Sequence, residues 1–185
     1  MKGISYAAIR GKKTLIRGDV GKGKTRLLSR LLSEAAESEG AGSITVIDMA
    51  PGERSVGERK VGGQLVIPAL PVARYIAPER VVAPRLEGAT AEEVVRLAMR
   101  NASALEPCLA QYIASPTPVL FVNDLTIYLQ CGKAELLGEA ITLAKTFVGA
   151  AYWGDFFDDK GSGINEKERL LLGKLIGLFD IVVDL

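Results

Sequence analysis

The sequence has 185 residues, of which 48 % are apolar and 24 % charged, and its formal net charge is +1. These values predict one globular domain over 1–185, and the balanced charge gives no reason to expect a nucleic acid or membrane partner. Histidine is absent and the two cysteines lie far apart, which excludes histidine bases and zinc sites built from histidine and cysteine. Chemistry must therefore use carboxylates, lysine, arginine, hydroxyls, backbone amides and a hard metal.

The first elements predicted are short strands around one helix. Apolar runs at 4–10 and 13–17, joined by a Gly-Lys pair, predict an N-terminal β-hairpin. Leucine and alanine recur at helical spacing over 24–38, which predicts a helix with one buried face. The continuous β-branched run at 43–48 is typical of a buried parallel strand.

Residues 49–89 are irregular and contain five of the eight prolines. A long segment of this kind inside one domain is typical of a functional loop or a small inserted unit. One of its arginines could supply charge to a phosphate group, although solvated surface charge is the simpler interpretation. The candidates are Arg54, Arg59, Arg74, Arg80 and Arg85.

The second half of the chain alternates helices with strands. Thr90 and Glu93 form a capping-box pattern, which predicts a helix over about 91–105, followed by a second helical piece at about 106–114. The alternation predicts a three-layer α/β fold, with a mainly parallel central sheet and helices on both faces. The remaining elements expected are strands at 118–124, 146–152 and 181–185, and helices over about 136–144 and 165–179.

One motif carries specific chemistry, the string GDVGKGKT at 18–25, which matches G-x-x-x-x-G-K-[ST] at every fixed position. We expect Gly18, Gly21 and Gly23 to take positive φ, so that backbone N–H groups curl around an anion at a helix N-terminus. Lys24 can then reach β- and γ-phosphates, and Thr25 can ligate Mg²⁺.

This string resembles the Walker A motif of the P-loop NTPases, with a strand before it and a helix after it as that superfamily requires. The resemblance implies binding of a nucleoside triphosphate with Mg²⁺, and a catalytic role for Lys24. The nucleotide contacts that it implies are Gly18, Asp19, Val20, Gly21, Lys22, Gly23, Lys24, Thr25 and Arg26.

Two acids stand at the predicted carboxyl ends of strands, where ligands of such sheets bind. Asp124 follows VLFVN and resembles the Walker B aspartate, which implies that it holds Mg²⁺ together with Thr25. Asp48 follows ITVI and is the alternative metal-side acid. Its position is similar to that of an acid in P-loop kinases and in ATPases related to nitrogenase iron protein. That likeness implies a catalytic role in orienting water or accepting a proton.

The function implied is hydrolysis of ATP in preference to GTP, since the guanine-reading N-K-x-D is absent. No glutamate follows Asp124, no ABC signature occurs, and no specific family is indicated. Two alternatives stay open: a kinase or other transferase with a small acceptor, or a slow nucleotide switch or assembly subunit with a protein partner. GKGKT is also similar to a string in P-loop corrinoid adenosyltransferases.

Further expectations concern the setting of the protein. The chain has no apolar stretch long enough for a signal peptide or a membrane span, which favours the cytoplasm. Asparagine and glutamine are scarce, a weak sign of a thermophilic source. The aromatic side chains at 152–157 could stack on a base, or else pack in the core or in a homodimer interface. They are Tyr152, Trp153, Phe156 and Phe157.

Overall fold

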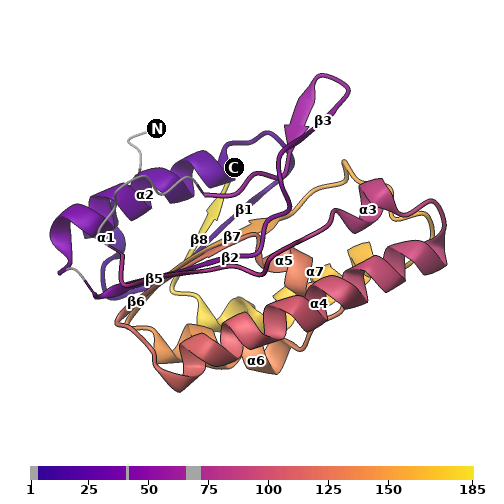
Figure 1. Ribbon diagram of the computed structural model, residues 1–185. Coiled ribbons are helices and arrows are strands. Elements are labelled where there is room, and N and C mark those ends of the chain that lie inside the picture. The colour runs from indigo at the N-terminus through magenta and orange to yellow at the C-terminus, as the bar shows by residue number, and fades with distance from the viewer. Residues whose placement is uncertain (1–3, 41, 66–71) are drawn as a thin grey trace.

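The computed structural model describes residues 4–40, 42–65 and 72–185, which form a central sheet of six strands with helices on both faces (Figure 1). The strand order is β5-β2-β6-β7-β1-β8, and all neighbouring strands are parallel. The α/β class and the parallel sheet are therefore confirmed. The strands are β1 (Lys13–Gly18), β2 (Ile44–Asp48), β5 (Arg74–Ile76), β6 (Val119–Asn123), β7 (Thr146–Tyr152) and β8 (Ile181–Asp184).

The helices divide between the two faces of this sheet (Figure 1). One face carries α1 (Tyr6–Ile9) and α2 (Lys24–Ser38). The other carries α4 (Ala91–Ala114), α5 (Leu125–Leu129), α6 (Ala134–Leu143) and α7 (Ile164–Leu175), which continues as the 3-10 turn η1 (Ile176–Leu178).

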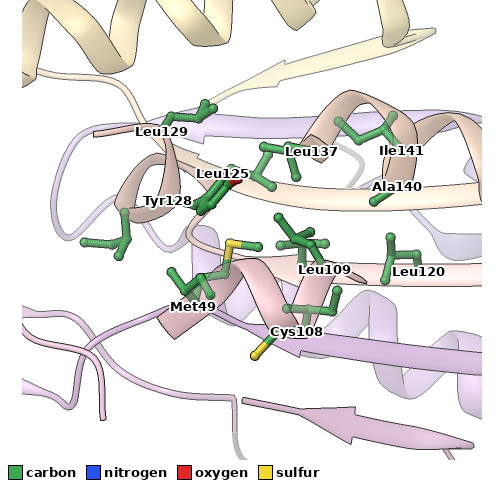
Figure 2. Close-up of a cluster of buried hydrophobic side chains, with 14 of the residues drawn as sticks. Met49, Cys108, Leu109, Leu120, Leu125, Tyr128, Leu129, Leu137, Ala140 and Ile141 are labelled. Carbon is green, nitrogen blue, oxygen red and sulfur yellow. The ribbon is translucent and has the colours of Figure 1, made fainter. Parts of the chain in front are cut away.

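Successive side chains of a buried strand point to opposite faces of the sheet, so one apolar run can pack against the helices on both faces. In β6, Val119 and Phe121 pack with the α1 and α2 side chains, whereas Leu120 and Val122 pack with the helices of the opposite face. Figure 2 shows part of this second cluster, in which Leu120 lies among side chains from α4, α5 and α6. The sheet is thus the middle of three layers.

The N-terminal β-hairpin expected from the sequence is wrong. Residues 6–9 form the short helix α1, and only the second of the two expected strands, β1, exists. Tyr6 and Ile9 are three residues apart and both are buried against α2. The Tyr6 backbone N–H also donates to Glu34 Oε2 over 2.6 Å. An apolar run this short has no resolvable period, so packing against α2 decided its conformation.

Helix α4 differs from expectation because it continues through Pro107 instead of ending near residue 105. Leu105, Leu109 and Tyr112 are fully buried on both sides of the proline, and this continuous packing offsets the lost backbone hydrogen bond. Its start is as predicted, since Thr90 Oγ1 accepts a hydrogen bond from the Glu93 N–H. No helix in the described ranges, α4 included, is long and apolar enough to cross a membrane.

The irregular segment 49–89 has small elements of its own. Strands β3 (Arg54–Val56) and β4 (Arg59–Val61) form a separate antiparallel hairpin, which projects beyond the sheet in Figure 1. The segment also supplies the edge strand β5 and the short helix α3 (Pro84–Glu87). Pro68 and Pro71, two of its prolines, lie outside the described residues.

Candidate functional site

A cavity of about 440 Å³ lies beyond the carboxyl ends of β1, β2, β6 and β7. The loop after β1 and the start of α2 form one wall, and the β3–β4 hairpin and α3 form another. The helix that follows β1 covers one face of the sheet, whereas the helix that follows the neighbouring β7 covers the other (Figure 1). Chain directions diverge at such a point, which is where open parallel sheets bind ligands.

The glycines of the loop at 18–25 have two different roles. Gly21 and Gly23 have φ of 76° and 87°, the left-handed conformation that was expected. Gly18, in contrast, does not have positive φ and ends β1. A Cβ there would lie 2.6 Å from the Leu185 carbonyl oxygen, so Gly18 is required for the close approach of the C-terminal residue.

Six of the nine residues expected to contact nucleotide line the cavity. Gly18, Asp19 and Lys22 do not. The Asp19 carboxylate accepts a 2.7 Å hydrogen bond from the Val20 N–H and packs tightly against Gly154, where no Cβ would fit. Asp19 therefore stabilises the conformation of the loop from outside the cavity wall. The six that line the cavity are Val20, Gly21, Gly23, Lys24, Thr25 and Arg26.

Lys24 folds back over its own loop. Its Nζ donates to the Asp19 carbonyl over 2.8 Å and lies 5.9 Å from the centre of the Tyr152 ring. Burial lowers the pKa of Lys24, and the nearby charges of Asp124 and Asp19 oppose that shift. The Lys24 ammonium group is thus held within the loop by the neutral Asp19 carbonyl oxygen, which an anion could replace as the acceptor.

Asp124 also lines the cavity, directly after β6. Its backbone is left-handed, with φ of 57°, which is uncommon for a residue other than glycine and concentrates at functional sites. Burial raises the pKa of Asp124, against the lowering effects of a 2.7 Å hydrogen bond from Thr126 and of the charges on Lys24 and Arg85.

Thr25 and Asp124 fit a hard cation, since both offer oxygen atoms to one cavity. Among the described residues, no three acidic, cysteine or histidine side chains cluster in a way that could hold a metal. A cation held by Thr25 and Asp124 would complete its coordination with other oxygens, such as those of water or of a bound ligand.

Asp48 is fully buried and is not part of the cavity wall. Its Oδ1 accepts from the Ala50 N–H at 3.1 Å and from Asn123 Nδ2 at 2.9 Å. Its Oδ2 accepts from the Leu65 N–H at 2.6 Å and from the Tyr75 hydroxyl at 2.9 Å. This carboxylate ties the irregular segment to β6 and β5, and its bonds favour an anchoring role over the catalytic role expected.

Asn123 is a further site residue, in addition to those expected from the sequence. Its side chain joins Asp48 to the Gly63 carbonyl, and the residue lines the cavity beside Asp124. Its position could have indicated a site residue, because it is the polar residue that ends an apolar strand. It holds the irregular segment against the end of β6.

Arg85 alone of the five candidate arginines lines the cavity. It is buried, with 6 % of its surface exposed, and its Nη1 donates to Glu168 Oε1 at 2.7 Å. The guanidinium carbon lies 5.0 Å from the Tyr152 ring centre and 4.5 Å from that of Phe157. These two expected aromatic residues therefore pack on a cation beside the cavity.

Glu168 is the buried counter-ion of this arginine and is 2 % exposed. Its Oε2 accepts from Gln130 Nε2 at 3.2 Å. Burial raises the pKa of Glu168 to about 7, although Arg85 and Gln130 act to lower it. Nothing in the sequence near position 168 distinguishes Glu168 from a surface glutamate, so its role could not be predicted.

Fold and cavity together define a parallel α/β protein with a glycine-rich loop at the switch point of its sheet. No protein-family model matches the chain, and no curated protein matches it.

Proposed function

We propose that this protein binds a nucleoside triphosphate with Mg²⁺ in the cavity and hydrolyses it, with ATP preferred to GTP. One observation carries the proposal. The GDVGKGKT loop lies between β1 and α2 at the switch point and opens onto a cavity whose wall also includes Lys24, Thr25 and Asp124. Backbone N–H groups and a helix N-terminus at such a place favour an anion.

Each group has a defined task in this proposal. The loop N–H groups bind phosphate oxygens, and Lys24 exchanges the Asp19 carbonyl for oxygens of the β- and γ-phosphates. Thr25 and Asp124 would hold Mg²⁺, which would neutralise charge that develops on the phosphates. The hairpin and α3 supply further walls of the cavity, and electrostatic interactions are stronger beside protein walls than in bulk water.

A transferase is the second candidate, and the extent of the cavity favours it. The wall continues past the loop to Glu53 and Lys60 of the hairpin region and to Pro84 of α3. Glu53 and Lys60 form an ion pair of 2.7 Å with each other, so that part of the wall carries polar groups of both charges that a small polar acceptor could contact. The two functions differ in whether phosphate is released without an added acceptor.

Phosphate release with Mg²⁺ and ATP, measured without an acceptor, tests the proposal. Lys24→Ala should reduce release to background, because Lys24 is the cavity's phosphate-facing lysine. Lys22→Ala is the matched control, since Lys22 is exposed and outside the cavity wall, and it should retain the wild-type rate. Release that Lys24→Ala leaves intact would refute the proposal, and release that begins only with an added metabolite would favour the transferase.

A further inference from the structure

Arg85 differs from the other four arginines of the irregular segment because it is buried and lines the cavity, whereas the others are exposed or half-buried and lie outside the cavity wall. Arg54 and Arg80 are substantially exposed and pair with Glu87 of α3, with nitrogen–oxygen distances of 2.9 Å and 3.9 Å. Placing a guanidinium out of water is unfavourable unless its partners compensate. Arg85 therefore needs an explanation that the others do not.

The anchoring of Arg85 uses only one of its nitrogen atoms. Nη1 donates to both Glu168 Oε1 at 2.7 Å and Asn165 Oδ1 at 2.6 Å. Nε and Nη2 have no hydrogen-bond acceptor among the described residues, although a guanidinium carries donors on all three nitrogens. Neither Glu168 nor Asn165 lines the cavity, whereas Arg85 does. Glu168 and Asn165 therefore hold Arg85 from outside the cavity, and the N–H groups on Nε and Nη2 remain available to a ligand in the cavity.

Two aromatic rings restrict the guanidinium further. Tyr152 and Phe157 both contact it, and the two rings are tilted by 59° to each other with their centres 5.1 Å apart. A guanidinium that is already held by an ion pair and by aromatic packing loses little conformational entropy when it binds an oxyanion. This arrangement suits bidentate contact with phosphate.

Arg85 also belongs to the proposed phosphate site by its position. It lines the same cavity as Lys24 and Asp124, so two cations share a wall with one acid. A triphosphate with its chain in the loop and its metal at Asp124 would bring its terminal phosphate among these groups. A purely structural ion pair between α3 and α7 would not need an arginine at the cavity wall.

We propose that Arg85 binds the terminal phosphate of the nucleoside triphosphate, and that Glu168 is a positioning residue that holds the guanidinium for this contact. The inference rests on the proposed function. It adds that this chain supplies a phosphate-binding cation from its own α3. The chemistry recognised is a phosphate oxyanion, which could belong to the nucleotide or to free phosphate.

The test compares the affinities of a non-hydrolysable triphosphate and of the diphosphate by calorimetry, with Mg²⁺. The double variant Arg85→Gln/Glu168→Gln removes both charges and so avoids leaving one of them buried alone. We expect it to lose about tenfold or more in triphosphate affinity, as for a charged hydrogen bond, and less than about twofold in diphosphate affinity. Glu168→Gln alone should give an intermediate ratio of the two affinities.

Arg80→Gln is the control, an exposed arginine of the same segment that should leave both affinities unchanged. Equal losses for the two nucleotides in the double variant, or no loss, would overturn the inference. Binding of diphosphate that free phosphate enhances in the wild type but not in the double variant would place Arg85 on free phosphate instead of the nucleotide. A wild-type protein that binds neither nucleotide would refute the proposed function itself.

Discussion

At the scale of single residues, two acids that look alike in the sequence have opposite surroundings. Each follows a run of apolar residues: Asp48 is the last residue of β2, and Asp124 comes directly after β6. Asp48 is fully buried and accepts four hydrogen bonds, whereas Asp124 lines the cavity and accepts one from a side chain, that of Thr126. A carboxylate whose two oxygens already accept two hydrogen bonds each is a poor ligand for a metal and a poor acceptor for water.

The isosteric variants Asp48→Asn and Asp124→Asn should therefore affect different properties. In Asp48→Asn, one carboxylate oxygen becomes an NH₂ group that faces hydrogen-bond donors and cannot accept from them. We expect this variant to lower the free energy of unfolding by about 2–4 kcal/mol. Asp124→Asn should change stability little, since asparagine tolerates a left-handed backbone, but should abolish the Mg²⁺ dependence of phosphate release. Urea unfolding and a Mg²⁺ titration measure the two effects, and the reverse pattern would make Asp48 the metal-side acid.

At the scale of elements, α4 holds the segment that leads into α3. The buried Asn101 side chain accepts from the Val82 N–H at 3.1 Å and donates to the Val82 carbonyl at 2.9 Å. It thus satisfies both polar backbone groups of a residue only three positions before Arg85. The long helix thereby fixes the place of the short one, and α3 is too short to hold that place alone.

Asn101→Ala should destabilise the protein by about 2–4 kcal/mol, because the buried Val82 groups lose both partners. It should also weaken discrimination between triphosphate and diphosphate, since Arg85 is displaced with its segment. Arg100→Ala, at the neighbouring exposed position of the same helix, is the control and should stay within about 0.5 kcal/mol of wild type. Urea unfolding measures both, and a neutral Asn101→Ala would show that α3 is held by other contacts.

At the scale of the whole molecule, the pair of Arg85 and Glu168 joins α3 to α7 across 83 residues of chain. It therefore connects a cavity wall to the helical layer on one face of the sheet. Burial opposes the charged form of Glu168 more strongly than Arg85 favours it and raises the pKa of Glu168 to about 7, so global stability should depend on the protonation of this residue.

The sign of this dependence follows from proton linkage. Between the ordinary glutamate pKa of about 4.5 and a folded-state value of about 7, the folded state binds more protons than the unfolded state. This contribution is fully present below pH 4.5 and is lost as the pH rises through 7, at no more than about 1.4 kcal/mol per pH unit. Urea unfolding between pH 5 and 8 should show wild type losing stability relative to Glu168→Gln, and parallel curves would contradict it.

The sequence alone determined the parallel α/β class and the glycine-rich loop, because both depend on local patterns. Continuous apolar strands alternate with amphipathic helices, and the signature at 18–25 is contiguous. Short segments were harder to predict, as at 6–9, where packing against α2 made a helix from a run too short to show a period.

Only the tertiary structure decided which arginine lines the cavity and which strand-end acid is buried. Five arginines of the irregular segment were equal candidates in the sequence, and Arg85 is distinguished by Glu168, Asn165 and two aromatic rings more than sixty residues away. Asp48 is likewise defined by partners as distant as Asn123. Burial and pairing are properties of non-local contacts, and a single sequence records no such contacts, so these assignments required the folded chain.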